Sequence, residues 1–129
     1  MNRPPGIPTI SPQDAAAELE AARTGGDASP GRPLLVDVRE HDEFATERIA
    51  GAALLPISEL RDRHRDLPTD RPLLVLCQAG ARSQSATMFL LQSGWTDVRN
   101  VEGGVNAWKQ AGLPVETGAP QPGEGELPS

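Results

Sequence analysis

The strongest constraint on the fold is that short apolar runs alternate along the chain with stretches that favour helix. Three runs have strand character: Leu34–Val38, Leu73–Leu76 and Val98–Val101. Strands that alternate with helices favour a mostly parallel sheet with helices on both faces. We therefore expect an α/β fold with a sheet of about five strands. Ligand sites in such folds lie beyond the carboxyl ends of the strands.

Local signals place the helices and one further strand. Helix is expected over Ser11–Arg23, Glu40–Thr46, Ser58 to about Asp66, Gln84–Gln92 and a last stretch that holds Trp108. The expected N-caps are Ser11, with Pro12 at the first helical position, and Ser58. The expected stops are Gly25-Gly26, Gly94, and Gly112 with Pro114. A short strand is expected over Gly51–Leu55, and Pro56 ends it.

The length of 129 residues is that of a single domain. We expect this domain to cover residues 9–117. Residues 1–8 and 118–129 are rich in proline and glycine, and we expect both segments to be disordered because they bury too little apolar surface to offset chain entropy. On this interpretation the tail after Thr117 is dispensable for stability and activity.

Composition argues against several classes of protein. The net charge is −6, the chain has no tyrosine, and no basic block stands out, so nucleic-acid binding is not expected. No apolar run is long enough to cross a bilayer, and the N-terminus lacks the apolar region of a signal peptide. A single cysteine cannot form an internal disulfide, so a cytoplasmic location is the default expectation. No group of side chains has metal-ligand spacing, and we expect neither a metal nor a cofactor.

That single cysteine, Cys77, directly follows the apolar run Leu73–Leu76. A lone cysteine is most often a small buried apolar residue. Here, however, it lies after the strand, before the start of a helix, where N–H groups and the helix dipole favour an anion. Gly80 permits the tight curvature that turns several N–H groups inward. On the residues alone, a reactive thiolate and a buried structural cysteine are about equally supported.

Four motifs in order resemble the rhodanese-like sulfurtransferases. In chain order they are Leu35-Val36-Asp37-Val38-Arg39, Glu43-Phe44 with Arg48-Ile49-Ala50-Gly51-Ala52, Cys77-Gln78-Ala79-Gly80-Ala81-Arg82-Ser83, and Asn100-Val101-Glu102-Gly103-Gly104 with Trp108. The resemblance extends from about Thr9 to Thr117. Two positions depart from it, since Arg48 stands where the family usually has histidine and Ala50 where it usually has proline.

The resemblance implies a persulfide enzyme in which Cys77 is the catalytic nucleophile. The donor is a small sulfane-sulfur compound such as thiosulfate, and the acceptor is a thiol, including a protein thiol, or cyanide. Neither a nucleic acid nor a membrane is implied. The loop would bind the substrate through Gln78, Ala79, Gly80, Ala81, Arg82 and Ser83. Its N–H groups would stabilise the anionic persulfide, and Arg82 would help to hold a negative donor.

Further residues are candidates to line this site, because the loops Arg39–Asp42, Cys77–Ser83 and Glu102–Val105 should share one rim of the sheet. The candidates are Asp37, Arg39, His41, Gly103 and Gly104. For Asp37 and Arg39 we favour a bracing role, for His41 a surface position at a helix start, and for the glycines a tight turn. His64, on a charged helix face, receives little weight as a catalytic residue.

Two other functions stay open. The domain is also compatible with a persulfide carrier or regulatory module with little turnover, since Arg82 is the single cation of the loop. A cysteine phosphatase or arsenate reductase is the weaker alternative. Four residues separate Cys77 from Arg82, whereas cysteine phosphatases of related architecture carry one more and so form a wider cradle.

Overall fold

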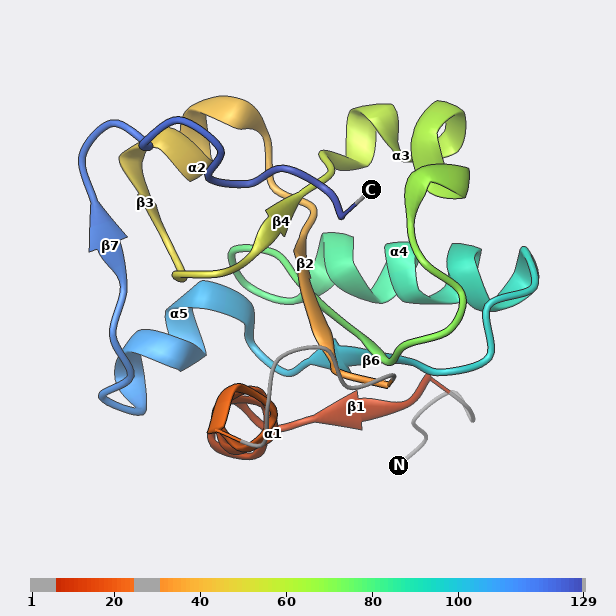
Figure 1. Ribbon diagram of the computed structural model, residues 1–129, viewed down its shortest axis with the longest axis horizontal. Coiled ribbons are helices and arrows are strands. Elements are labelled where there is room, and N and C mark those ends of the chain that lie inside the picture. Colours follow the sequence, from red (N-terminus) through yellow and green to blue (C-terminus); the bar gives the residue numbers. More distant parts are fainter. Residues whose placement is uncertain (1–6, 25–30, 129) are drawn as a thin grey trace.

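A computed structural model describes residues 7–24 and 31–128 (Figure 1). In chain order the elements are β1 Thr9–Ile10, α1 Pro12–Thr24, β2 Leu34–Asp37, α2 His41–Thr46, β3 Glu47–Arg48, β4 Ala53–Leu54, α3 Ile57–Arg63, the 3-10 turn η1 His64–Asp66, β5 Leu73–Leu76, α4 Ala81–Gln92, β6 Val98–Val101, α5 Gly104–Gln110 and β7 Glu116–Thr117. None of the helices in these residues combines the length and apolar character that a membrane crossing requires.

The central sheet has five strands in the order β1-β6-β5-β2-β4, and every pairing in it is parallel. The expected α/β fold with about five parallel strands is therefore confirmed. The register aligns Val36 with Val75, and Val75 with Asn100. This alignment brings the carboxyl ends of β2, β5 and β6 to one edge. The sequence signals missed β1 and the small antiparallel pair of β3 and β7, each only two residues long.

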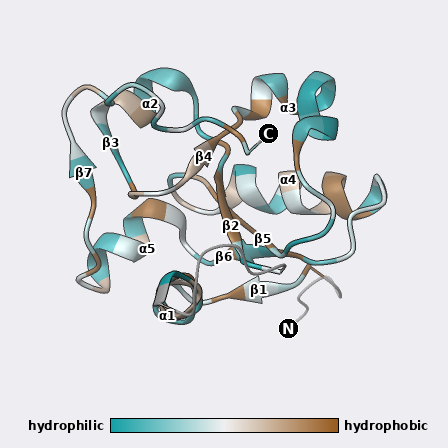
Figure 2. Cartoon of the chain, viewed as in Figure 1, coloured by the Kyte–Doolittle hydropathy of each residue, from teal (hydrophilic) through white to brown (hydrophobic). Residues whose placement is uncertain are grey.

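The core lies in two layers, one on each face of the sheet. Alternate strand residues face opposite layers, because successive side chains of a strand point to opposite sides. Leu34, Val36 and Val38 belong to the layer beneath α3 and α4, whereas Leu35 belongs to the layer beneath α1 and α5. Figure 2 shows the resulting brown apolar colour along β2 and β5. Burial on both faces explains why these strands read as continuous apolar runs.

Several local expectations can be compared with the structure. Ser11 caps α1 as expected, its Oγ accepting the N–H of Asp14 at 3.1 Å. The expected stop at Gly25-Gly26 lies outside the described residues. Ser58 is not an N-cap: α3 begins at Ile57 after Pro56, and the Ser58 hydroxyl donates to Glu40 at 2.8 Å.

The helix after the cysteine loop begins earlier than expected. It starts at Ala81 instead of Gln84, so Arg82 and Ser83 lie in its first turn. The reason is Gly80, whose φ of +110° allows the chain to turn into the helix within a single residue. The loop proper is therefore only the segment between Cys77 and Gly80.

The expected disordered ends differ from the structure where it describes them. Residues 1–6 lie outside the described part, but the Pro8 carbonyl accepts the N–H of Asn100 at 2.8 Å. Residues 118–128 pack on the domain instead of forming a disordered tail. The Gly125 carbonyl accepts the N–H of Leu54 at 2.8 Å, and Leu127 packs against the apolar layer. In Figure 1 this blue segment runs past β4. The segment docks because β4 is an edge strand with free backbone groups. Composition alone does not reveal such an edge.

Candidate active site

Cys77 directly follows the central strand β5, and its thiol lies at the focus of the loop. The Gly80 N–H points at Sγ with a nitrogen–sulfur distance of 3.0 Å, and the Ser83 N–H does so at 3.3 Å. Cys77 is only 1% exposed. The loop and the first turn of α4 thus direct two backbone donors at one sulfur atom, which is the geometry that stabilises a negative charge there.

A buried hydroxyl completes the surroundings of the sulfur. The Ser83 Oγ lies 3.3 Å from Cys77 Sγ and 2.5 Å from Oδ1 of Asn100 on β6, to which it donates. Both residues are almost fully buried. Sequence reasoning did not single out Asn100. The available signal was a pair of polar residues, Arg99 and Asn100, in the strand that neighbours β5.

The start of α5 holds the cysteine loop from the other side. The N–H groups of Val105 and Asn106 donate to the carbonyls of Cys77 and Gln78 at 2.9 and 3.0 Å. Gly104 permits this close approach, because a Cβ there would overlap the Cys77 carbonyl and lie 2.7 Å from the Gln78 carbonyl. The expected role of the glycine pair as a tight turn near the loop is consistent with this placement.

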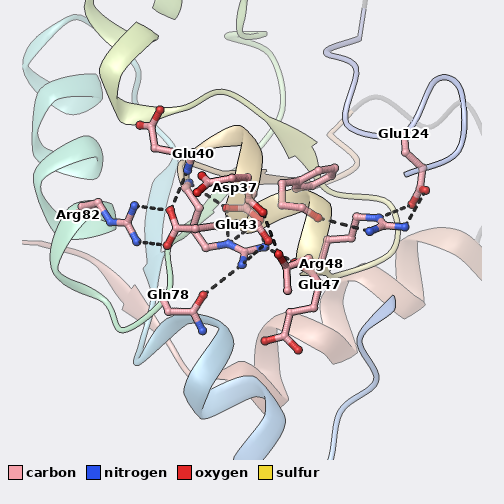
Figure 3. A network of polar contacts seen from close by, with 12 residues as sticks. Asp37, Glu40, Glu43, Glu47, Arg48, Gln78, Arg82 and Glu124 are labelled. Carbon is pink, nitrogen blue, oxygen red and sulfur yellow. Dashed lines mark hydrogen bonds and ion pairs between the residues drawn. The ribbon is translucent and has the colours of Figure 1, made fainter. Parts of the chain in front are cut away.

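Arg39 and Asp37 form a buried ion pair behind the loop, each side chain being 1% exposed, with a shortest distance of 2.8 Å between Nη2 and Oδ2. Arg39 also donates to Oε1 of Gln78 at 3.1 Å and to the Glu47 carbonyl at 2.8 Å. Gln78 in turn donates to Asn106 at 2.8 Å. The pair therefore ties β2 to the cysteine loop (Figure 3), and Gln78 extends this network to α5, in line with a bracing role.

Arg82 is paired with a carboxylate that sequence reasoning did not place at the site. Its Nη1 and Nη2 donate to Oε1 and Oε2 of Glu43 on α2 at 2.7 and 2.8 Å (Figure 3). These hydrogen bonds lower the pKa of Glu43 from 4.5 to about 2, and they raise the pKa of Arg82. Glu43 is therefore ionised throughout the physiological range.

The structure brings most of the predicted site residues together. Direct hydrogen bonds link the elements that carry Asp37, Arg39, Cys77, Gln78, Gly80, Arg82 and Ser83. His41 is the exception, because its ring is exposed and its described partner is Glu59 on α3, at 3.0 Å. Within the described part of the chain, no three His, Cys, Asp or Glu side chains gather as a metal site would require.

Known proteins resemble this chain in sequence and in fold. The family model "Rhodanese-like domain" matches residues 13–111. A protein named "Sulfurtransferase" from Allochromatium vinosum is 40% identical over 82 residues, which are 64% of this chain and 77% of that protein. The "HTH-type transcriptional regulator Rv0324" of Mycobacterium tuberculosis is 36% identical over 112 residues, and the match covers 85% of this chain but about half (48%) of the regulator. A rhodanese-related protein from Thermoplasma volcanium shares the fold with a TM-score of 0.73 and 33% identity, over 85% of this chain and 98% of the other.

Proposed function

This chain belongs to the rhodanese-like domain family, and we propose that it is a sulfurtransferase that carries a sulfane sulfur as a persulfide on Cys77. The observation that carries the proposal is the convergence of the Gly80 and Ser83 N–H groups on Sγ. Such donors favour a thiolate over a thiol and then stabilise an anionic persulfide at the same place. The 40% sequence identity with a protein named as a sulfurtransferase supports the same reaction class.

The proposed reaction has two transfers. The Cys77 thiolate attacks the outer sulfur of a donor such as thiosulfate, the donor's sulfur–sulfur bond breaks, and sulfite leaves with the electron pair. An acceptor thiolate or cyanide then attacks the outer sulfur of the persulfide, and the Cys77 thiolate is regenerated. A cysteine that is already ionised needs no general base for either step.

The position of the donors explains how the loop would serve both transfers. The N–H groups of Gly80 and Ser83 belong to a fixed backbone, which the hydrogen bonds from Val105 and Asn106 hold on the opposite side. Donors that are oriented before the reaction need no reorganisation when charge shifts between the sulfur atoms. The proposal includes a cytoplasmic location, because a thiol nucleophile needs a compartment that keeps it reduced.

Mass spectrometry of the intact protein tests this function directly. Exposure to thiosulfate or to a small persulfide should add one sulfur atom to the wild-type chain and none to Cys77→Ser, because a serine hydroxyl forms no persulfide. The circular dichroism of the variant should be unchanged. Hydrolysis of an aryl phosphate by the wild type, lost in Cys77→Ser, would instead support the phosphatase alternative.

A persulfide carrier or regulatory module is the second candidate. Two observations favour it: the pairing of Arg82 with Glu43, which reduces the attraction for an anionic donor, and the similarity to a protein named as a transcriptional regulator. A carrier would load sulfur on Cys77 but turn over slowly with free cyanide or small thiols. Steady-state turnover after confirmed loading distinguishes the two functions.

A further inference from the structure

We propose that Glu43 selects the sulfur donor, favouring a small thiol persulfide, which carries at most one negative charge on its two sulfur atoms, over the dianion thiosulfate. This inference rests on the proposed function, since it concerns the donor that loads Cys77. Glu43 would act as a specificity-determining residue through Arg82, without contact with the reacting atoms.

The first observation is that Glu43 occupies the hydrogen-bonding edge with which Arg82 would hold an anion. Both terminal nitrogens of the guanidinium donate to the two carboxylate oxygens, at 2.7 and 2.8 Å. Such a two-point contact is the one that arginine makes with an oxyanion. A thiosulfate ion must therefore displace Glu43 or approach an arginine whose charge is already balanced.

The second observation is that the described network around the loop offers no unpaired cation that could attract an anionic donor. Arg39, the other cation bonded to the loop, is held by the buried carboxylate of Asp37. Glu40 adds a further carboxylate near Arg82, and it accepts hydrogen bonds from Ser58 and from the backbone N–H of Glu43. Figure 3 shows these carboxylates gathered on the α2 side of the loop.

The third observation is that Glu43 holds its charge. The hydrogen bonds from Arg82 lower the pKa of Glu43 to about 2. The carboxylate therefore stays ionised near neutral pH and keeps the charge of Arg82 balanced. Fixed charge at the mouth of a site changes the association rate of a charged substrate by roughly 10- to 1000-fold, and this effect weakens with salt.

A thiol persulfide lessens this penalty, because it carries at most one negative charge where thiosulfate carries two, and its neutral form R–S–S–H carries none. The Cys77 thiolate attacks the outer sulfur of R–S–S–H and forms a new sulfur–sulfur bond. The bond between the two donor sulfurs breaks, R–S⁻ leaves with the electron pair, and the proton stays on the transferred sulfur. The products are the Cys77 persulfide and a thiolate, so atoms and electrons balance without a further reactant.

The test compares loading rates of Cys77 in the wild type and in Glu43→Gln. The probes are thiosulfate and the persulfide of 2-mercaptoethanol, and the added sulfur is followed by mass spectrometry after timed quenching. Glutamine keeps the shape and one acceptor oxygen but removes the charge. We expect the thiosulfate-to-persulfide rate ratio to rise about tenfold at low salt. Glu40→Gln is the matched control, since it removes a nearby negative charge without releasing Arg82 and should shift the ratio much less.

The outcomes separate the inference from the function. A ratio that rises less than about threefold in Glu43→Gln, or as much in Glu40→Gln, overturns the role of Glu43. Absence of added sulfur with both donors in the wild type overturns the proposed function itself. The salt dependence of the wild type gives a further test without a variant. The rate at which thiosulfate loads Cys77 should stay level or rise between about 0.02 and about 0.5 M salt. A steep fall in this rate overturns the inference.

Discussion

Arg48 and Glu124 lie 76 positions apart in the chain and form an ion pair in which Nε donates to Oε2 at 2.9 Å and Nη2 to Oε1 at 3.1 Å. The Arg48 side chain is only 4% exposed. It also donates to the Gly118 carbonyl at 2.6 Å. The arginine that stands where related domains usually have histidine therefore fastens the C-terminal segment to the domain.

Removal of the chain after Thr117 should lower the melting temperature by several degrees. Arg48 would lose the Glu124 carboxylate and the Gly118 carbonyl, and its side chain would lose the segment that packs on it. The Leu54 N–H would also lose the Gly125 carbonyl. Differential scanning calorimetry measures the shift. Glu124→Gln should show part of it, and Glu126→Gln, an exposed carboxylate in the same segment, should show none. An unchanged melting temperature after truncation would contradict the docking.

The stability that Glu43 contributes should depend on pH in the acid range. Its folded pKa of about 2 lies below the ordinary value of 4.5, so the unfolded state binds more protons between these values. The contribution is therefore fully present above about pH 4.5 and is lost as the pH falls towards 2. Urea unfolding at stepped pH should show the wild type losing stability faster than Glu43→Gln over this window. Parallel curves for the two proteins would contradict the ion pair with Arg82.

Ser83→Ala should slow sulfur transfer by Cys77, although the protein should still fold. The change removes the hydroxyl next to Cys77 Sγ and leaves Oδ1 of the buried Asn100 without its donor. We expect a stability loss of about 1–3 kcal/mol and a slower transfer, because the unpaired Asn100 disturbs the first turn of α4, whose Ser83 N–H points at Sγ. Ser85→Ala, on an exposed position of the same helix, is the control. Equal rates in the two variants would show that the hydroxyl is not needed at the sulfur.

Gly104→Ala should disrupt the loop by direct overlap. The added methyl group meets the Cys77 carbonyl and lies 2.7 Å from the Gln78 carbonyl, so α5 and the loop must separate. Gly112→Ala is the matched control, because its φ of +79° is also positive but nothing lies within 4 Å of a Cβ there. The control isolates the backbone strain, about 1 kcal/mol. Thermal unfolding should show a larger loss for Gly104→Ala, together with slower loading of Cys77. Equal losses would mean that the close approach is unimportant.

The elements that the sequence predicts well depend on local patterns. Continuous apolar runs mark strands that are buried on both faces, and β2, β5 and β6 lie where such runs predict them. Ser11 caps α1 because its hydroxyl needs a partner only three residues away. The wrongly predicted start of α4 also has a local cause. It depends on the φ of Gly80, a backbone angle that composition alone does not specify.

By itself the sequence determined the strand–helix alternation and the place of Cys77 at the carboxyl end of a central strand, because hydrophobic periodicity and turn residues act over a few positions. The tertiary structure alone decided the partners of the charged side chains. Arg82 meets Glu43 across 39 positions, and Arg48 meets Glu124 across 76. Many carboxylates along the chain are equally suitable in sequence. Only packing brings a particular one within hydrogen-bond distance, and that packing sets both the charge beside the loop and the docking of the C-terminal segment.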